Sequence, residues 1–114
     1  MCYSSANSFQ TTVVACVLAM GYKHGGAIEN AMNFFLEHVD TDDVAALVAD
    51  CKLKKYRIPG YGHAVLDVDH RAETIFDGGK ETGFYGKYSE FAQKVHREIN
   101  EISSKEIPLN VDGA

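Results

Sequence analysis

The chain has 114 residues, a length that predicts one domain with one hydrophobic core. Hydrophobic residues make up 46% and charged residues 24%, which excludes wholesale disorder. The sequence contains no run of about 18 apolar residues, the length needed to span a membrane. The formal charge of −5 argues against a nucleic-acid scaffold. Its three cysteines are widely spaced and form no CxxC pair, so we expect reduced thiols and a cytoplasmic protein.

Helical periodicity predicts two helices before residue 40. The first covers residues 8–20 and is ended by Gly21, and the second runs from about Gly25 to His38. The expected inner face of the first consists of Phe9, Val13, Val14, Val17 and Leu18. That of the second consists of Ile28, Met32, Phe35, Leu36 and Val39.

A third helix is expected to begin after Thr41 as its cap, with Asp42 and Asp43 at the positive end of the helix dipole. Its inner face consists of Val44, Leu47, Val48 and Cys51. Pro59 prevents further helix, and the Pro-Gly-Tyr-Gly run indicates a tight loop.

Two more helices follow, a short one over about 69–77 and a longer one over about 88–103. Ala72, Ile75 and Phe76 face inward in the former, which Gly78 and Gly79 should end. Phe91, Val95, Ile99 and Ile102 form the stripe of the latter. Because no stretch alternates apolar and polar residues for long, we predict an all-α fold of about five helices.

Two histidines lie in glycine-flanked loops, where backbone can approach a ligand closely. His24 is expected near a helix N-terminus, where a neutral imidazole could donate a hydrogen bond to a carbonyl, although it could equally cap the helix. His63 ends the Gly-Tyr-Gly loop. Four basic residues precede that loop and could either meet phosphates or form the solvated end of a helix: Lys52, Lys54, Lys55 and Arg57.

Further along, Asp67, Asp69 and His70 do not share one helix face, so no metal site is expected. Arg71 could clamp a carboxylate with its guanidinium fork, or could be an ordinary surface arginine. Asp112 could act as a general base if its surroundings are partly apolar, or could belong to a frayed terminus.

Four segments taken in order change the odds between these alternatives. They are His-Gly-Gly-Ala at 24–27, Ile-Pro-Gly-Tyr-Gly-His-Ala-Val at 58–65, Asp-His-Arg at 69–71 and Pro-Leu-Asn-Val-Asp at 108–112. Their order and spacing resemble the small domain of the citrate synthase family over nearly the whole chain. Two departures are His70, where the family usually has proline, and Asp67, an acid that would weaken a phosphate contact there.

The resemblance implies condensation of acetyl-CoA with oxaloacetate to citrate and CoA, a reaction of the tricarboxylic acid cycle. It implies that His24 binds the thioester carbonyl, His63 polarises the oxaloacetate carbonyl, Asp112 removes the methyl proton and Arg71 holds a carboxylate. It also implies that a loop and one tail residue bind CoA: Arg57, Ile58, Pro59, Gly60, Tyr61, Gly62, Ala64 and Asn110. No metal or cofactor beyond the CoA thioester substrate is implied.

The family's large domain and most of its dimer interface have no counterpart in the 114 residues. We therefore expect a single small domain, excised or truncated, with little activity alone, that belongs to a homo-oligomer when the large domain is present. Three alternatives stay open: cleavage of citryl-CoA, as at the citrate-lyase end of ATP-citrate lyase; a CoA-binding module without catalysis; and a helical interaction domain.

Overall fold

The structure is a computed structural model that describes residues 8–21 and 25–114. Five α-helices follow one another: α1 (Phe9–Leu18), α2 (Ala27–His38), α3 (Val44–Leu53), α4 (His70–Thr82) and α5 (Lys87–Ile102), and a short 3₁₀ helix, η1 (Val111–Gly113), ends the chain. Within the described ranges, β-pairing is limited to two isolated bridges. The predicted all-α fold of about five helices is confirmed.

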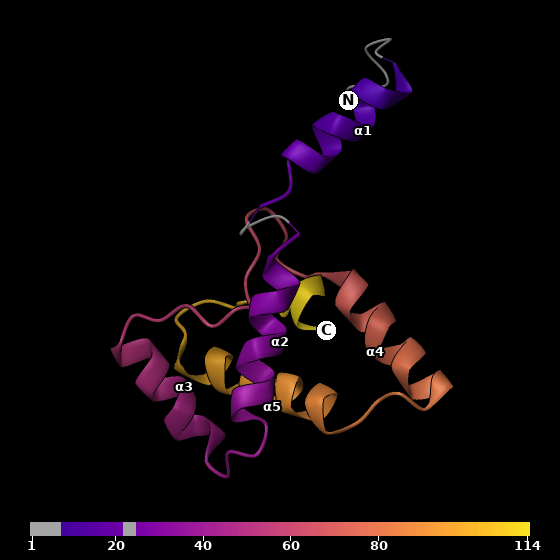
Figure 1. The fold of residues 1–114 in the computed structure, drawn as a ribbon. Coiled ribbons are helices and arrows are strands. Elements are labelled where there is room, and N and C mark those ends of the chain that lie inside the picture. Colours follow the sequence, from indigo (N-terminus) through magenta and orange to yellow (C-terminus); the bar gives the residue numbers. More distant parts are fainter. Residues whose placement is uncertain (1–7, 22–24) are drawn as a thin grey trace.

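Helices α2 to α5 pack into one body with α5 at its centre (Figure 1). α3 packs against α5, α2 contacts both α5 and η1, and α4 contacts η1 from another side. The C-terminal turn is therefore held between α2 and α4, where it can meet loops that come from other parts of the chain.

Aromatic rings fill the space between α2 and α5. Phe35 lies edge-to-face against Phe91, with 5.9 Å between ring centroids, and against Tyr61 at 6.4 Å. All three are buried, as is Val95. Burial of each large apolar side chain contributes roughly 1.5–3 kcal/mol, so this cluster anchors the loop that contains Tyr61 to the helical body.

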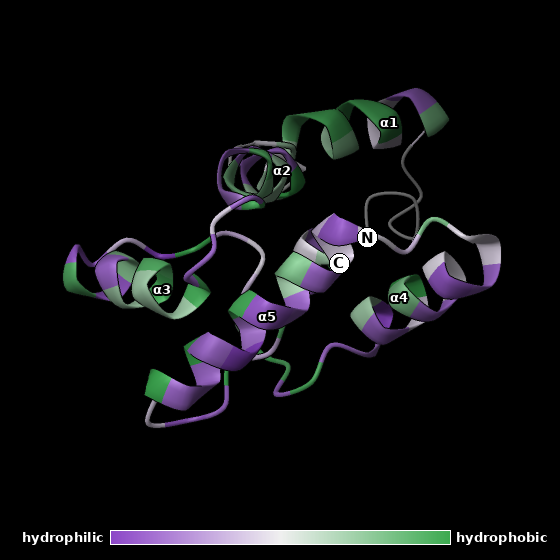
Figure 2. Ribbon diagram, turned by 90° about the horizontal axis from the view of Figure 1, so that it is seen from below, coloured by the Kyte–Doolittle hydropathy of each residue, from purple (hydrophilic) through white to green (hydrophobic). Residues whose placement is uncertain are grey.

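Helix α1 stands apart from this body (Figure 1). Figure 2 shows it as apolar along most of its length. The residues expected on its inner face are exposed, with 72% for Phe9 and 79% for Leu18, so that expectation is wrong. Its projection also explains a radius of gyration of 16.7 Å, since about 13 Å is typical of a compact domain of this size.

Helix α2 carries two apolar stripes, and the stripe expected to face the core is only partly buried: Phe35 and Val39 pack in the core. Ala31, Phe34 and Phe35 are buried, whereas Ile28, Met32 and Leu36 are exposed. The two stripes lie on different sides of the helix, so α2 can pack against its own domain with one and against a partner with the other.

Two helix boundaries also differ from expectation. Asp43, rather than Thr41, caps α3, because its Oδ1 accepts the Ala46 N–H at 2.9 Å. Helix α4 continues through Gly78 and Gly79 and ends at Gly83, which has a φ of +79°. The two internal glycines cost roughly 1 kcal/mol each, but Phe76 packs against Tyr85 beyond the helix end and holds the longer helix in place.

Candidate functional site

Two distant parts of the chain run side by side and form the framework of the site. Tyr61 and Leu109 form an antiparallel bridge. The Gly62 N–H donates to the Pro108 carbonyl at 2.7 Å, and the Asn110 N–H donates to the Gly60 carbonyl at 3.0 Å. The Asn110 Nδ2 donates to the Gly62 carbonyl at 2.8 Å. The Gly-Tyr-Gly loop and the C-terminal segment are therefore one hydrogen-bonded unit.

Close approach of this loop to η1 depends on two glycines. Gly60 has a φ of +89°, and a Cβ built on it would lie 2.8 Å from the Cα of Gly113. A Cβ on Gly113 would lie 2.6 Å from the Gly60 carbonyl oxygen. Neither position has room for a side chain, so the two glycines allow backbone-to-backbone contact.

The same unit is fixed to helix α5 by buried and half-buried polar groups. The Tyr61 hydroxyl donates to the Ala92 carbonyl at 2.8 Å, and burial raises the pKa of this phenol. Asn100 donates to the Ile107 carbonyl at 3.1 Å and accepts the Ile107 N–H at 2.7 Å. A rigid helix thus sets the position of both the loop and the tail.

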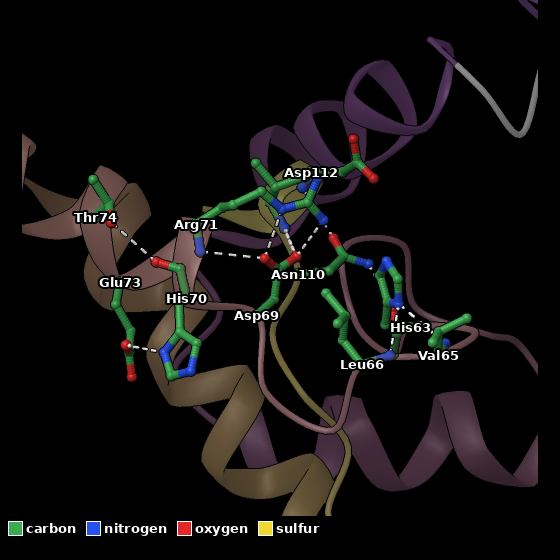
Figure 3. Close-up of polar contacts among 12 residues, drawn as sticks. His63, Val65, Leu66, Asp69, His70, Arg71, Glu73, Thr74, Asn110 and Asp112 are labelled. Carbon is green, nitrogen blue, oxygen red and sulfur yellow. Dashed lines mark hydrogen bonds and ion pairs between the residues drawn. The ribbon is translucent and has the colours of Figure 1, made fainter. Parts of the chain in front are cut away.

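His63 has a defined tautomer in this setting. Its Nδ1 accepts the backbone N–H groups of Val65 at 3.1 Å and Leu66 at 2.9 Å (Figure 3). Since a nitrogen that accepts hydrogen bonds carries no proton, the ring proton lies on Nε2. The side chain is exposed, so Nε2–H is a donor that a ligand can reach.

Arg71 lies at the start of α4, where Asp69 caps the helix. Its Nε and Nη2 donate to the two carboxylate oxygens of Asp69, both at 2.8 Å (Figure 3). These bonds are the main cause that lowers the pKa of Asp69 to about 2. His70 is the first residue of α4, a position that also suits proline. The histidine that stands where the family usually has proline therefore leaves Arg71 at the second position of the helix.

Asp112 lies in η1, half-buried, and its N–H donates to Asn110 Oδ1 at 3.0 Å. The pKa of the Arg71 guanidinium is raised, first by the hydrogen bond to Asp69 and to a smaller extent by the charges of Asp69 and Asp112. Asp112, the candidate base, therefore lies close enough to Arg71, the candidate carboxylate clamp, for their charges to interact, although 41 positions separate them in the sequence (112 minus 71).

Asp69 and His70, two of the residues considered from the sequence as metal ligands, have other partners. Asp69 faces Arg71, and His70 Nδ1 lies 2.9 Å from Glu73 Oε2. Across the ranges that the structure describes, no three His, Cys, Asp or Glu side chains gather in a way that could hold a metal ion. Nor is any helix within those ranges long and apolar enough to cross a membrane.

A cavity of about 390 Å³ opens between the Gly-Tyr-Gly loop, α3 and the end of α5. Five of the residues expected to be at a CoA or catalytic site line it: Arg57, Ile58, Tyr61, Gly62 and His63. The Arg57 guanidinium lies so close to the loop that a Cβ on Gly62 would be 3.0 Å from it. Lys52 and Lys105 also line the cavity, together with the acids Asp67 and Glu106.

The basic patch expected before the loop is divided by the structure. Lys52 lines the cavity and donates to the Ile102 carbonyl, whereas Lys54 pairs with Asp50 at 2.6 Å. Lys55 has a positive φ of 54° just past α3. Only part of the patch is thus available to a phosphate in the cavity.

Four more of the residues expected to bind CoA lie outside the lining of the cavity. Gly60 and Asn110 belong to the loop-to-tail junction, and Pro59 and Ala64 flank the loop without lining the cavity. His24 lies outside the described residues. Sequence reasoning missed the role of Asp69, although an aspartate just before a helix and two positions before an arginine is a signal for a cap that also pairs with that arginine.

Comparisons with known proteins agree with the four motifs. The sequence matches the family described as "Citrate synthase, C-terminal domain" over residues 1–114. It is 31% identical over 107 residues to a probable ATP-citrate synthase of Dictyostelium discoideum, which covers 90% of this chain and 17% of that protein. It is 32% identical over 97 residues to citrate synthase of Synechocystis sp., which covers 81% of this chain and 24% of that protein.

A solved structure of citryl-CoA lyase from Hydrogenobacter thermophilus has the same fold, with a TM-score of 0.84 and 41% identity over 94% of this chain and 43% of that one. The chain therefore spans about a fifth of the curated relatives named above and less than half of the solved one. On the motifs, the fold and these matches, the chain belongs to the citrate synthase family and corresponds to its small, C-terminal domain.

Proposed function

We propose that this chain is the catalytic small domain of an enzyme that forms or breaks the carbon–carbon bond between the acetyl methyl carbon and the oxaloacetate carbonyl carbon. The observation that carries the proposal is a hydrogen-bonded junction of the Gly-Tyr-Gly loop, the C-terminal segment and the start of α4, where the Val111 N–H donates to Asp69. This junction holds the His63 loop, Arg71 and Asp112 in one region. These residues supply a hydrogen-bond donor, a carboxylate clamp and a base, and this reaction needs all three.

In the direction of condensation, the Asp112 carboxylate takes a proton from the methyl group of acetyl-CoA. The carbon–hydrogen electron pair becomes the enolate, whose carbon attacks the keto carbon of oxaloacetate to form the new bond. The keto oxygen receives the displaced π pair while His63 Nε2–H donates a hydrogen bond to it, and this oxygen gains a proton from solvent as Asp112 releases the methyl proton, so no net proton is gained or lost. His24 would donate to the enolate oxygen. Citryl-CoA results, and hydrolysis of its thioester gives citrate and CoA.

Arg71 can hold the second substrate while it remains bound to Asp69. A guanidinium has five N–H bonds, of which the ion pair uses one on Nε and one on Nη2. The Nη1 and Nη2 edge stays free for a bidentate bond to a carboxylate of oxaloacetate or citrate. Because the Arg71 side chain is 56% exposed, that edge is open to a ligand.

The cavity beside the Gly-Tyr-Gly loop is the proposed site of CoA. Its lining combines apolar side chains with three cationic ones, Lys52, Arg57 and Lys105, which suits a ligand that has both a ring system and phosphates. The acidic Asp67 and Glu106 at the same cavity oppose phosphate binding. Because Lys52 already donates to the Ile102 carbonyl and Arg57 lies against the Gly-Tyr-Gly loop, Arg57 is expected to make the main phosphate contact.

The reverse reaction, cleavage of citryl-CoA, is the second candidate. The same base and donors run it backwards: the hydroxyl proton leaves to solvent as the bond breaks, His63 Nε2–H hydrogen-bonds the oxygen that becomes the keto group, and Asp112 returns a proton to the methyl carbon. It is favoured by the 41% identity to a protein named citryl-CoA lyase. Condensation is favoured by the match to a citrate synthase.

Either reaction needs a second domain. Two helices expose many large apolar side chains, which is more than a soluble monomer usually leaves bare. They are Phe9, Val13, Val14, Val17 and Leu18 on α1, and Ile28, Met32 and Leu36, the outer stripe of α2. We propose that the large domain of the same enzyme covers this surface, and that the complete enzyme is a homo-oligomer in the cytoplasm. Small and large domains together then close over the substrates and exclude water.

A calorimetric titration of CoA into the chain at low salt tests the CoA site. We expect saturable binding that Arg57→Ala weakens about tenfold, and that Lys54→Ala leaves unchanged because Lys54 pairs with Asp50 away from the cavity. Binding that Lys54→Ala and Arg57→Ala weaken equally would place CoA elsewhere. No binding by a chain with intact helices would contradict a CoA site formed by this domain alone.

A further inference from the structure

Asp69 is a buried carboxylate that the proposed reaction does not use. Its exposed fraction is 3%, and among the residues that the structure describes it is the only charged one that is buried. A charge is removed from water at a cost of several kcal/mol unless partners surround it. Asp69 therefore has to be explained by its contacts.

Those contacts come from two separate parts of the chain. Oδ1 accepts the Arg71 backbone N–H at 3.2 Å and the Arg71 Nε–H at 2.8 Å. Oδ2 accepts the Arg71 Nη2–H at 2.8 Å and the backbone N–H of Val111 at 3.0 Å. One carboxylate thus binds the candidate clamp and the residue that directly precedes the candidate base.

Each contact fixes a different property of the site. The bidentate pair sets the plane of the guanidinium and leaves its outer edge for a ligand. The bond from Val111 fixes the start of η1, whose next residue is Asp112. A cap needs only the bond to the Arg71 backbone, so the other three bonds have no part in starting α4.

We propose that Asp69 is a positioning residue that couples the orientation of Arg71 to the placement of Asp112. This inference rests on the proposed function for its kinetic consequence, while the coupling itself is a property of the folded chain. Displacement of one partner moves the shared carboxylate and, through it, the other partner.

Two variants separate this role from helix capping. Asp69→Ser keeps a good cap, but its hydroxyl is too short to hold the guanidinium and the Val111 N–H. Val111→Pro removes the N–H that binds Asp69 and puts the proline ring where that hydrogen lay, which pushes the carboxylate away. Proline also suits the first position of a helix after an extended residue, as Asn110 is. Asp43→Ser is the matched control, because Asp43 caps α3 with one bond and pairs with no arginine.

The first readout is NMR of the chain, which needs no turnover. In Asp69→Ser we expect the Arg71 Nε–H to exchange with water about tenfold faster and the Asp112 carboxyl carbon to shift. In Val111→Pro, which tests the coupling from the tail and remains available if Asp69→Ser does not fold, the Asp112 carbon should shift and the Arg71 Nε–H should also exchange faster, because the carboxylate that both partners share moves. A folded Val111→Pro chain whose Arg71 Nε–H stays protected would contradict the coupling. Asp43→Ser should change neither. Unchanged Arg71 and Asp112 signals in folded variants would overturn the coupling.

The second readout is kinetic, with the chain joined to a large domain. Asp69→Ser should raise the KM for oxaloacetate and lower kcat, each about tenfold, and Val111→Pro should change both constants in the same directions, because it displaces the carboxylate that orients Arg71. A cap without coupling would leave both constants unchanged below the unfolding temperature. If the unaltered chain shows no turnover while the NMR changes occur as expected, the proposed function fails and the coupling stands.

Discussion

Gly113→Ala is the substitution that most directly tests the contact between the loop and the tail. The φ of Gly113 lies outside the left-handed region, so an alanine costs nothing in backbone conformation. Its Cβ would lie 2.6 Å from the Gly60 carbonyl oxygen, 2.9 Å from the Gly60 Cα and 3.1 Å from the Gly60 carbonyl carbon. All three atoms are backbone and cannot rotate away.

The magnitude follows from these distances. Carbon atoms pack at about 3.5–4.0 Å, so η1 must move away from the loop by several tenths of an ångström or more. That movement stretches the bond from Asn110 to Gly60, now 3.0 Å. Overpacking of a tight contact costs about 1–3 kcal/mol, which corresponds to a fall in Tm of roughly 5–15 °C for a domain of this size.

Thermal and urea unfolding followed by circular dichroism measures this cost, with Gly78→Ala as the matched control. Gly78 lies within α4 and has no atom within 4 Å of a built Cβ, so the same substitution should stabilise by about 0.5–1 kcal/mol. Opposite signs for the two variants are expected. A Gly113→Ala chain as stable as the unaltered one would refute the close contact and, with it, the proposed framework of the site.

Three further outcomes are expected. Tyr61→Phe should destabilise by about 1 kcal/mol in urea unfolding, because the Ala92 carbonyl loses a buried donor, whereas Tyr88→Phe on the exposed start of α5 should have no effect. The ion pair with Arg71 lowers the pKa of Asp69 to about 2, so its stabilising contribution is complete above about pH 4 and is lost as the pH falls toward 2; an acid titration in which Asp69→Ser and the unaltered chain lose stability in parallel would contradict this. Without a large domain, the exposed apolar surface should make the chain self-associate. Met32→Lys, on the outer stripe of α2, should reduce this self-association in sedimentation experiments, and Asn33→Lys, at an exposed polar position of the same helix, should not. Equal effects of the two variants would show that the stripe is not the contact surface.

The sequence predicted where the helices lie better than which faces they bury. Periodicity identified α2, but this helix has two apolar stripes, and only the one with Phe34 and Phe35 packs within the domain. Local pattern cannot distinguish a face for the core from a face for a partner. The apolar run of α1 misled for the same reason.

Motifs placed His63, Arg71 and Asp112 in one family site, and the structure describes how they are joined. The missing element was Asp69, whose bond to Val111 spans 42 positions. Sequence spacing shows that Asp69 can cap a helix and meet Arg71, because both are local. The sequence contains no signal for the bond between Asp69 and Val111, because only folding brings these two residues close together. The extension of α4 past two glycines likewise depends on the packing of Phe76 against Tyr85.

The most direct test of the account is an assay of the chain joined to a citrate synthase-family large domain, with acetyl-CoA and oxaloacetate in one arm and citryl-CoA in the other. The account predicts turnover in at least one arm, lost by a factor of about a hundred or more in Asp112→Asn and unchanged in Asp43→Asn, which alters a carboxylate at the start of α3. Absence of turnover in both arms from a folded assembly, or full activity of Asp112→Asn, would contradict it.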